Sequence, residues 1–338
     1  MDRRTFACHA LTQAAAAASL GIAAPARAQA PTKVRIVETV HILFFTPAYV
    51  ALRRGFFKEQ GLDVEITPAN GTDKATALLL AGSADVMLVG PEAAFYVAAS
   101  QSPTKIKMIA GIGKRDGAMV VGRQPLRELK ADDLRGKTII GSAIGSTPAV
   151  FLQAYLRKKG LDPVKDVNVI PNIAPPAKRG AFLSGQADFA VFYEPDASAV
   201  ESAGKGHVVA SIGQEIGAID HTVFIASDPY IAANRATLQK LCNAIAKAQK
   251  WLHGASPEAI AETIAPEFKG LSQDVLVSAS RRGLTLDMWK ATPTVTPETV
   301  NAFAKILVDG GTLRPSPAIP YENLVDPSFA QAAVKAVS

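Results

Sequence analysis

Short apolar runs alternate along this chain with stretches whose apolar residues recur at helical spacing. The runs at 86–89 and 189–192 are uniformly apolar, which is typical of strands buried on both faces. The same alternation predicts further strands at 34–40, 64–66, 106–112, 118–121, 138–140, 167–170, 207–210 and 223–226. It predicts helices at 47–57, 73–80, 91 onward, 147–159, 176–183, 195–202 and through most of the chain after 229. Strands that alternate with helices predict an α/β fold.

One strand–helix unit occurs twice. Gly61-Leu62-Asp63 precedes Leu80-Ala81-Gly82-Ser83-Ala84-Asp85 and an apolar run, and Gly160-Leu161-Asp162 precedes Leu183-Ser184-Gly185-Gln186-Ala187-Asp188 and another. Two similar units predict two lobes, and the cleft between them is a natural place for a ligand. We expect residues 31–122 to begin lobe 1, 123–215 to form lobe 2, and 216–338 to return to lobe 1 and add C-terminal helices. The Pro-rich tail after Gly310 is expected to lie along the surface.

Residues 1–30 have the features of an export signal. Arg3 and Arg4 precede an Ala-rich apolar stretch, and Ala28-Gln29-Ala30 has the small-x-small form that signal peptidase cleaves. The arginine pair followed by Phe6 resembles a twin-arginine signal, with an ordinary secretory signal or an uncleaved anchor as the alternatives. The stretch is shorter than the ~20 apolar residues of a spanning helix. We therefore expect cleavage near Ala30 and a periplasmic location.

Charge and cysteine content exclude several classes of protein. Without residues 1–30 the chain loses three arginines and one aspartate, so the net charge falls from +6 to +4. Neither a basic run nor many aromatic residues (7%) are present, so a nucleic-acid partner is not expected. Cys8 lies in the signal, which leaves Cys242 alone and without an internal disulfide partner. Its apolar helical neighbours predict a buried small hydrophobe.

Several motifs resemble those of one protein family. They are Pro47-Ala48-Tyr49-Val50-Ala51, the run from Gly55 to Val64, Leu80 to Val86, Asp133-Leu134-Arg135-Gly136-Lys137 and Glu194-Pro195. In this order they resemble the periplasmic substrate-binding proteins of nitrate/sulfonate/taurine-type ABC importers, a family that also holds binding proteins for the thiamin pyrimidine precursor. The resemblance implies a type II periplasmic binding fold, with two α/β lobes joined by two crossing strands. It also implies a monomer that delivers a small ligand to a permease with a cytoplasmic ATPase and meets the membrane only through that permease.

Four loops lie where strands end and helices begin, which is where ligands bind in open α/β sheets. Helix N-termini there carry free N–H groups and a partial positive charge. We expect the ligand-binding residues to be Phe44, Phe45, Thr46, Gly90, Pro91, Glu92, Ser142, Gly145, Ser146, Thr147, Tyr193 and Glu194. Asn70, Asn172 and Arg115 are weaker candidates, each open to interpretation as a solvated loop residue.

These residues point to more than one ligand chemistry. The Gly- and Ser-rich loop before Thr147 suits a sulfonate, carboxylate or nitrate, although a simple helix cap would look the same. Phe44 and Phe45 favour a ligand with a ring or an apolar arm, unless they pack in the core. Glu92 and Glu194 would accept hydrogen bonds from an amine or an amino-heterocycle, or else interact with their own helix N-termini. The predicted ligand is therefore a small organic molecule with a polar end.

Rival functions need groups that the chain does not display. Some relatives are desulfinases with a catalytic cysteine after the first strand, and others are pyrimidine synthases with a Cys-rich motif. The loop from His41 to Thr46 has no cysteine, so neither enzyme is expected. The histidines show no metal-ligand spacing, and no phosphate-binding loop is complete, so we expect no catalytic residue, metal or cofactor. A periplasmic ligand sensor stays open beside the importer, because both need only binding and lobe closure.

Overall fold

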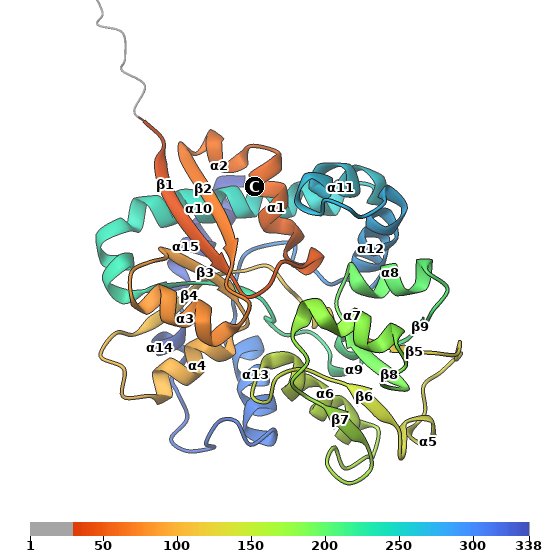
Figure 1. The fold of residues 1–338 in the computed structure, drawn as a ribbon. Coiled ribbons are helices and arrows are strands. Elements are labelled where there is room, and N and C mark those ends of the chain that lie inside the picture. The colour runs from red at the N-terminus through yellow and green to blue at the C-terminus, as the bar shows by residue number, and fades with distance from the viewer. Residues whose placement is uncertain (1–29, 338) are drawn as a thin grey trace, which may run out of the picture. The chain divides into compact units, whose positions relative to one another are not determined.

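The computed structural model describes residues 30–337, and residues 31–338 form one compact unit with two α/β lobes (Figure 1). The predicted signal, including its arginine pair, lies outside the described residues. Each lobe is built on a five-stranded sheet. Among the described residues, no helix is both long enough and apolar enough to cross a membrane.

The first sheet has the order β2-β1-β3-β10-β4. Its strands are β1 (Thr32–Glu38), β2 (Leu62–Pro68), β3 (Val86–Val89), β4 (Ile106–Gly111) and β10 (Val223–Ser227). Strand β1 runs parallel to β2 and β3, whereas β10 is antiparallel to β3 and β4. The second sheet repeats this plan in the order β7-β6-β8-β5-β9. Its strands are β5 (Met119–Gly122), β6 (Thr138–Ile140), β7 (Asn168–Ile170), β8 (Phe189–Phe192) and β9 (His207–Ser211).

Two crossings join the lobes, one from β4 to β5 and one from β9 to β10. Strand β5 pairs with β8 and β9 of the second sheet, so the predicted lobe boundary at residue 122 is wrong. The chain crosses at residues 112–118, before β5, and not within the polar segment 122–130. The chain returns through residues 212–222, which lie between β9 and β10. Each crossing delivers an antiparallel strand into the middle of a sheet, which ties the two lobes together.

The last aspartate of the repeated unit makes equivalent hydrogen bonds between strands in both lobes. Asp85 accepts a hydrogen bond from the Arg35 amide at 2.8 Å and returns one from its own amide to the Arg35 carbonyl at 2.9 Å. Asp188 makes the same pair of contacts with Thr138, at 2.9 and 3.0 Å. In each half, the aspartate of the repeat therefore ties the start of the third strand to the first.

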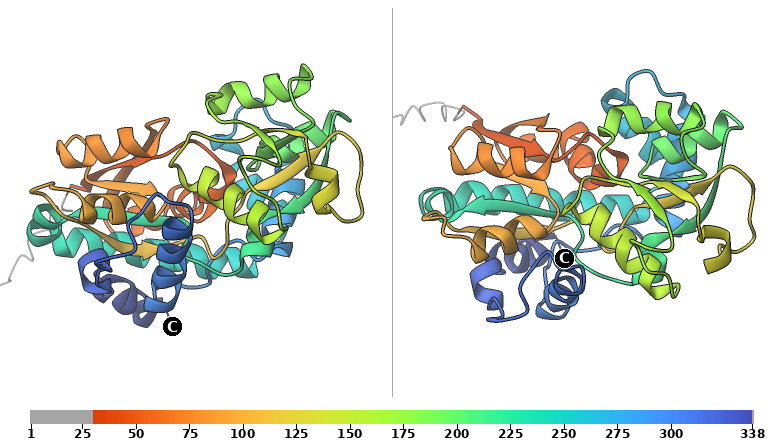
Figure 2. Two further views of the ribbon diagram at one scale, coloured as in Figure 1. Left: turned by 90° about the horizontal axis from the view of Figure 1, so that it is seen from below. Right: turned by 60° about the horizontal axis from the view of Figure 1, so that its bottom comes forward.

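Side chains of alternate strand residues point into two cores. In β3, Val86 and Leu88 belong to one core, while Met87 and Val89 belong to the other. Helices α1 (Thr46–Arg53), α2 (Phe56–Glu59), α10 (Asp228–Gly254) and α15 (Ser328–Val337) supply the first core, and α3 (Thr72–Leu80), α4 (Glu92–Ala99) and α13 (Pro297–Asp309) the second. In lobe 2, α7 (Pro175–Leu183) and α8 (Asp196–Ser202) cover one face and α6 (Thr147–Lys158) and α9 (Ile212–Ile216) the other (Figure 2). The helix α5 (Ala131–Leu134) precedes β6.

The C-terminal region contacts both lobes. Helix α11 (Pro257–Ile264) packs on α1, while α12 (Gln273–Thr285) packs on α8 and α13 on α6. The short helices η2 (Ala265–Glu267) and α14 (Tyr321–Leu324) complete this region. The tail is not merely a surface strap, because α15 buries Phe329, Ala330 and Ala333 against α10 and β4. The buried residues Phe329, Ala330 and Ala333 recur at helical spacing. The proline-rich segment before them, in contrast, predicts a tail along the surface.

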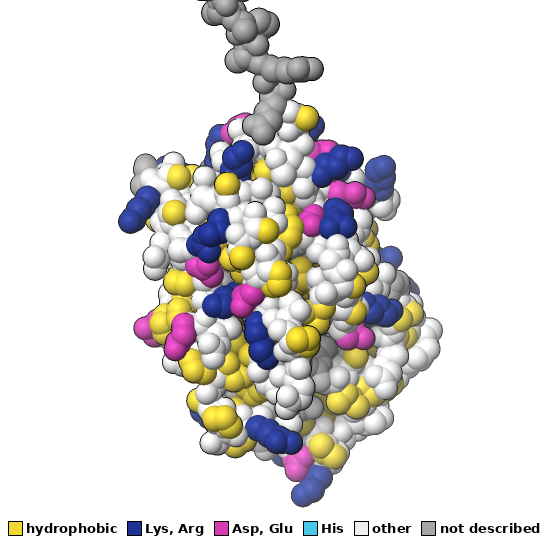
Figure 3. Space-filling model, turned by 90° about the vertical axis from the view of Figure 1, so that its left-hand side faces the viewer, with side chains coloured by type: hydrophobic (Ala, Val, Ile, Leu, Met, Phe, Trp, Pro, Cys, Tyr) yellow, Lys and Arg dark blue, Asp and Glu magenta, His cyan; other side chains and the backbone are white. Residues whose placement is uncertain are grey.

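The surface agrees with the mild net charge. On the face that Figure 3 shows, Lys and Arg side chains alternate with Asp and Glu side chains and with scattered apolar ones. That face carries no stripe of one sign.

The hydrogen bonds of Asp188 predict that its loss destabilises the protein more than the loss of Asp63, an aspartate elsewhere in the repeated unit. Asp188→Ala is expected to lower the free energy of unfolding by about 1–2 kcal/mol, because two strands lose a charge-assisted hydrogen bond. Asp63 is also exposed, but no hydrogen bond of its side chain occurs among residues 30–337, so Asp63→Ala is expected to stay within about 0.5 kcal/mol of the wild type. Urea unfolding followed by circular dichroism measures both. Equal midpoints for the two variants would contradict the role given to Asp188.

Candidate functional site

Loops from both lobes meet at the ends of the strands. The Leu43 amide of lobe 1 donates to the Glu194 carbonyl of lobe 2 at 3.0 Å, and the Tyr96 hydroxyl donates to the Gly145 carbonyl at 3.0 Å. The ring of Phe44, in the short helix η1 (Leu43–Phe45), lies 6.2 Å from that of Tyr193. The structure therefore brings together the four loops that the sequence singled out.

Glu92 and Thr147 face each other across this junction, each at the start of a helix. Glu92 is 2% exposed and Thr147 is 3% exposed. Thr72 donates to Glu92 Oε1 at 3.1 Å, but Glu92 Oε2 and Thr147 Oγ1 have no hydrogen-bonding partner within the described part of the chain. Burial raises the pKa of Glu92. A Cβ at Gly90 would lie 2.0 Å from Glu92 Oε2 and 2.6 Å from Thr147 Oγ1, so only glycine fits between them.

A second polar cluster lies on the crossings themselves, and sequence reasoning missed it. Asp116, 1% exposed, accepts hydrogen bonds at Oδ1 from the Tyr193 hydroxyl at 2.7 Å and the Ala118 amide at 3.1 Å. Its Oδ2 has no partner among residues 30–337, and burial raises the pKa of Asp116 to about 7. His221 Nε2 lies 3.6 Å from Asp116 Oδ1, and neither ring nitrogen makes a hydrogen bond to a described residue. Burial lowers the pKa of His221 to about 3, so its ring is neutral at pH 7.

Aromatic rings enclose the cluster. The centroids of Phe44 and Phe151 each lie 5.2 Å from that of His221, and Tyr193 stacks on His221 with planes 9° apart. Phe44 is buried against Gly113 and Gly117, where a Cβ would lie 2.6 Å from its ring. Phe44 therefore lines this cluster, and both Phe44 and Phe45 are buried in the larger hydrophobic core.

Other expected site residues hold the loops in shape. Thr46 donates to the Leu43 carbonyl at 2.5 Å and Ser146 to the Ala143 carbonyl at 2.6 Å. Pro91 is the buried N-cap residue of α4. Ser142 accepts a hydrogen bond at 3.1 Å from Lys178, a residue that the sequence did not suggest.

Lys178 is a buried cation at the carboxyl ends of β6 and β8. Its ammonium group also donates to the Val191 carbonyl at 2.9 Å, and burial lowers its pKa to about 8. An ammonium group has three N–H donors, so one is left beyond these two contacts.

Glu194 differs from Glu92 although both follow an equivalent strand. Arg282 of α12 pairs with Glu194 Oε1, and Ser198 donates its amide to Oε2 and its hydroxyl to Oε1, both at 2.9 Å. Burial raises the pKa of Glu194, and the Arg282 charge opposes that rise. Both carboxylate oxygens are thus already paired, and direct ligand contact by Glu194 stays a prediction.

The missed residues left only a faint signal. Asp116 and Arg115 lie in the Gly-rich run 111–117 between β4 and β5, which forms the first crossing and has no site motif. His221 and Phe151 had no motif around them. Of the weaker candidates, Arg115 lies on this crossing with its Nε buried and unpaired within the described chain, whereas Asn172 is exposed and Asn70 adopts a positive φ of 58°.

The arrangement suits binding better than covalent catalysis. Cys242 is fully buried in α10, where burial raises the pKa of its thiol, and its Sγ lies 3.8 Å from the Ile109 carbonyl. Within residues 30–337, no group of three or more His, Cys, Asp or Glu side chains could hold a metal ion. The junction instead offers unpaired donors and acceptors between two lobes.

The fold is that of periplasmic binding proteins. The nitrate-binding protein NrtA of Synechocystis PCC 6803 superposes with a TM-score of 0.77 at 15% identity, over 91% of this chain and 89% of NrtA. The alkanesulfonate-binding protein SsuA of Xanthomonas axonopodis pv. citri, solved with MOPS bound, gives a TM-score of 0.68 at 18% identity, over 90% and 98% of the two chains. The desulfurization enzyme DszB shares the fold as well, with a TM-score of 0.66 at 15% identity, over 91% of this chain and all of DszB.

Sequence comparison narrows the class to a family. The profile described as NMT1/THI5 like matches residues 43–259. A Bacillus subtilis protein named "Putative binding protein YtlA" is 34% identical over 300 residues, which is 89% of each chain. This chain belongs to the NMT1/THI5-like family, as its motifs predicted.

The Asp116–His221 cluster predicts two opposite dependences of stability on pH. The folded state keeps the Asp116 proton up to about pH 7, against an ordinary pKa of 3.8, so stability is present below pH 3.8 and falls as the pH rises to 7. The folded state loses the His221 proton above about pH 3, against an ordinary 6.5, so His221 makes stability rise across that range. Each slope is about 1.4 kcal/mol per pH unit, and the two cancel between roughly pH 4 and 6.5.

Single variants separate the two slopes. Relative to the wild type, Asp116→Asn is expected to gain stability as the pH rises from about 4 to 7, and His221→Gln to lose it between about 3 and 6.5. Urea midpoints at half-unit pH steps measure these differences, since other titrating groups contribute equally to all three proteins. Curves for both variants that run parallel to that of the wild type would show that the cluster does not titrate in this way.

Proposed function

We propose that this protein is the extracytoplasmic solute-binding component of an ABC importer. It captures a small organic ligand between its lobes in the periplasm and delivers it to a membrane permease. This proposal is supported by family membership and by the shared fold of the nitrate-binding protein NrtA and the alkanesulfonate-binding protein SsuA.

One observation carries the proposal: closing the lobes without a ligand leaves buried polar groups unpaired. Within the described residues they are Asp116 Oδ2, both ring nitrogens of His221, and the facing atoms Glu92 Oε2 and Thr147 Oγ1, which have no partner other than each other. Each such group costs about 1–3 kcal/mol when it is cut off from water without a partner. A ligand that pairs with them removes that cost only when the lobes are closed. Ligand binding and closure are then coupled, as a binding protein requires.

The unpaired atoms favour a ligand with N–H donors on a planar or apolar body. The carboxyl groups of Glu92 and Asp116 and one ring nitrogen of neutral His221 can each accept a hydrogen bond. The aromatic rings around them suit a flat molecule. An amino-heterocycle or an amine-bearing sulfonate or carboxylate meets these demands. Nitrate offers acceptors alone and matches them poorly. Lys178, beside Ser142, supports an anionic arm on the lobe 2 side.

Two other functions stay possible for this fold. An enzyme related to DszB would need a nucleophile, and the chain has no cysteine between His41 and Thr46. A ligand sensor would use the same binding and closure. The importer is preferred because the nitrate-binding protein NrtA and the alkanesulfonate-binding protein SsuA share the fold over about nine-tenths of this chain.

A thermal-shift panel tests the proposal. It holds taurine, MOPS and other sulfonates, aromatic carboxylates, aminopyrimidines and nitrate. A ligand at 100 times its dissociation constant is expected to stabilise the protein by about 2.7 kcal/mol. Thr147→Val, which removes a buried unpaired hydroxyl, is expected to leave the empty protein as stable or more so, and to weaken the best ligand by about tenfold.

Ser280→Ala is the matched control, because Ser280 Oγ is also buried and unpaired within the described chain but lies on α12, outside the junction. It is expected to have the same effect on the empty protein and none on affinity. The proposal fails if every compound is inert, or if one is chemically converted. Equal affinity losses in both variants would remove Thr147 from the site.

A further inference from the structure

One C-terminal segment touches both lobes and both crossings. It is residues 282–290, from the last turn of α12 to the chain beyond, and we call it the brace. Within it, Arg282 contacts lobe 2, Trp289 contacts lobe 1, and Met288 and Lys290 contact the crossings.

The lobe 2 end of the brace is an arginine fork. Arg282 Nη1 pairs with Glu194 and Nη2 with Glu201, and Nη1 also lies 3.2 Å from Ser198 Oγ. A guanidinium group matches two carboxylates in fixed geometry, which gives orientation as well as energy. Glu194 directly follows Tyr193, whose hydroxyl binds Asp116. The fork therefore holds the loop that presents Tyr193 to the junction.

The other contacts fix lobe 1 and the crossings. The Trp289 indole N–H donates to the Phe44 carbonyl at 2.9 Å, inside the core. The Met288 carbonyl accepts from the Lys114 amide at 2.7 Å, and the Lys290 amide donates to the Ile112 carbonyl at 2.9 Å, both on the first crossing. The Lys290 ammonium group pairs with buried Asp220 on the second crossing. The brace thus runs beside both crossings as a further link between the lobes.

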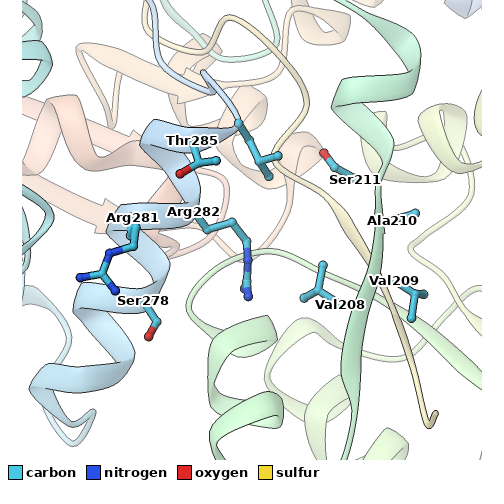
Figure 4. Close-up of a pocket in the computed structure, with 9 residues that line it drawn as sticks. Val208, Val209, Ala210, Ser211, Ser278, Arg281, Arg282 and Thr285 are labelled. Atoms are coloured by element: carbon cyan, nitrogen blue, oxygen red, sulfur yellow. The ribbon is translucent and has the colours of Figure 1, made fainter. Parts of the chain in front are cut away.

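The fork spans a place where α12 and lobe 2 are loosely packed. A groove of about 520 Å³ separates α12 from the edge strand β9, lined by Val208, Val209, Ala210, Ser211, Ser278, Arg281, Arg282, Thr285 and Leu286. Figure 4 shows Arg282 extending from α12 into this space. Beside this groove, the Arg282 ion pairs join two other links between α12 and lobe 2, the packing of α12 on α8 and a hydrogen bond from the Gln214 side chain to the Leu286 carbonyl at 2.8 Å.

We propose that the brace sets the balance between open and closed lobes, and that Arg282 is a positioning residue for the ligand loops. Its two ion pairs form when lobe 2 lies against α12 and are lost when lobe 2 swings away. Arg282 makes no contact with the Asp116–His221 cluster, and it acts through Glu194 and Tyr193. The inference rests on the lobe movement of the proposed function, and it adds a determinant outside the ligand site.

Spin-label distances between the lobes test the brace. Leu78 on α3 and Leu183 on α7 are exposed, so each can be changed to cysteine and labelled in a full chain carrying Cys8→Ser, while buried Cys242 stays unreactive. Without ligand, pulsed electron resonance is expected to give a short and a long distance in the wild type, and the best compound of the ligand panel is expected to shift it to the short one. Without ligand, Arg282→Met is expected to lower the closed population by about tenfold or more relative to the wild type, because one partner of a largely buried pair is gone.

Arg281→Met is the matched control. Arg281 is the neighbouring arginine on α12, and among residues 30–337 its one ion pair is with Glu258, with 59% of each side chain exposed. Its distances are expected to equal those of the wild type. Arg282→Lys keeps the positive charge but cannot pair with Glu194 and Glu201 in the same fixed geometry, so its closed population is expected to lie between those of the wild type and Arg282→Met. If Arg282→Met fails to fold, Arg282→Lys replaces it in the test.

Two failures are distinguishable. If the best compound of the ligand panel changes the distance in the wild type, while Arg282→Met and Arg282→Lys match the wild type, the brace proposal is overturned and the binding function stands. If no compound and no variant changes the distance, the lobes do not move, and both proposals fall.

Discussion

The exchange of strands between the lobes is the constraint on which the rest of this structure depends. Strand β5, which comes from the first crossing, sits between β8 and β9, and β10, which comes from the second, sits between β3 and β4. Since each sheet contains a strand that the crossing delivers, a shift of residues 112–118 or 212–222 moves a strand held by hydrogen bonds on both sides. The lobes can therefore rotate about the crossings but cannot separate. Asp116 and His221 lie on those two segments, so the polar centre of the site is placed at the pivot.

That placement explains an otherwise costly set of buried groups. Asp116, His221, Glu92 and Thr147 would destabilise a permanently closed core, because unpaired polar atoms lose their hydration without compensation. The cost is tolerable if closure is reversible and a ligand supplies the missing partners. Aromatic packing around His221 keeps water out when the lobes are closed, which strengthens each polar contact that a ligand makes.

The sequence predicted the two-lobed scaffold, whereas its ligand-binding residues stay predictions. Uniformly apolar runs such as 86–89 and 189–192, with the repeated Gly and Asp positions beside them, located the parallel strands and the two lobes. The four loops were also found, because strand ends and helix starts have local signatures. The lobe boundary was misplaced because β5 has the same apolar character in either sheet, and only pairing decides which sheet it joins. Asp116 and His221 were missed for the same reason, since their importance comes from the crossing and not from a motif.

Glu92 and Glu194 occupy equivalent positions in the two copies of the repeat but have different surroundings. Glu92 and Glu194 follow equivalent strands, so sequence position gives them the same expected role. In lobe 1 the carboxylate of Glu92 meets Thr72 and Thr147 and keeps one oxygen unpaired. In lobe 2 the C-terminal region brings Arg282 against Glu194 and neutralises it. Arg282, which lies outside the repeat, thus gives the loop of Glu194 a structural contact that the loop of Glu92 lacks. The other copy keeps one oxygen without a hydrogen-bond donor from the rest of the described chain except facing Thr147, so the proposed binding function gives the two copies different roles.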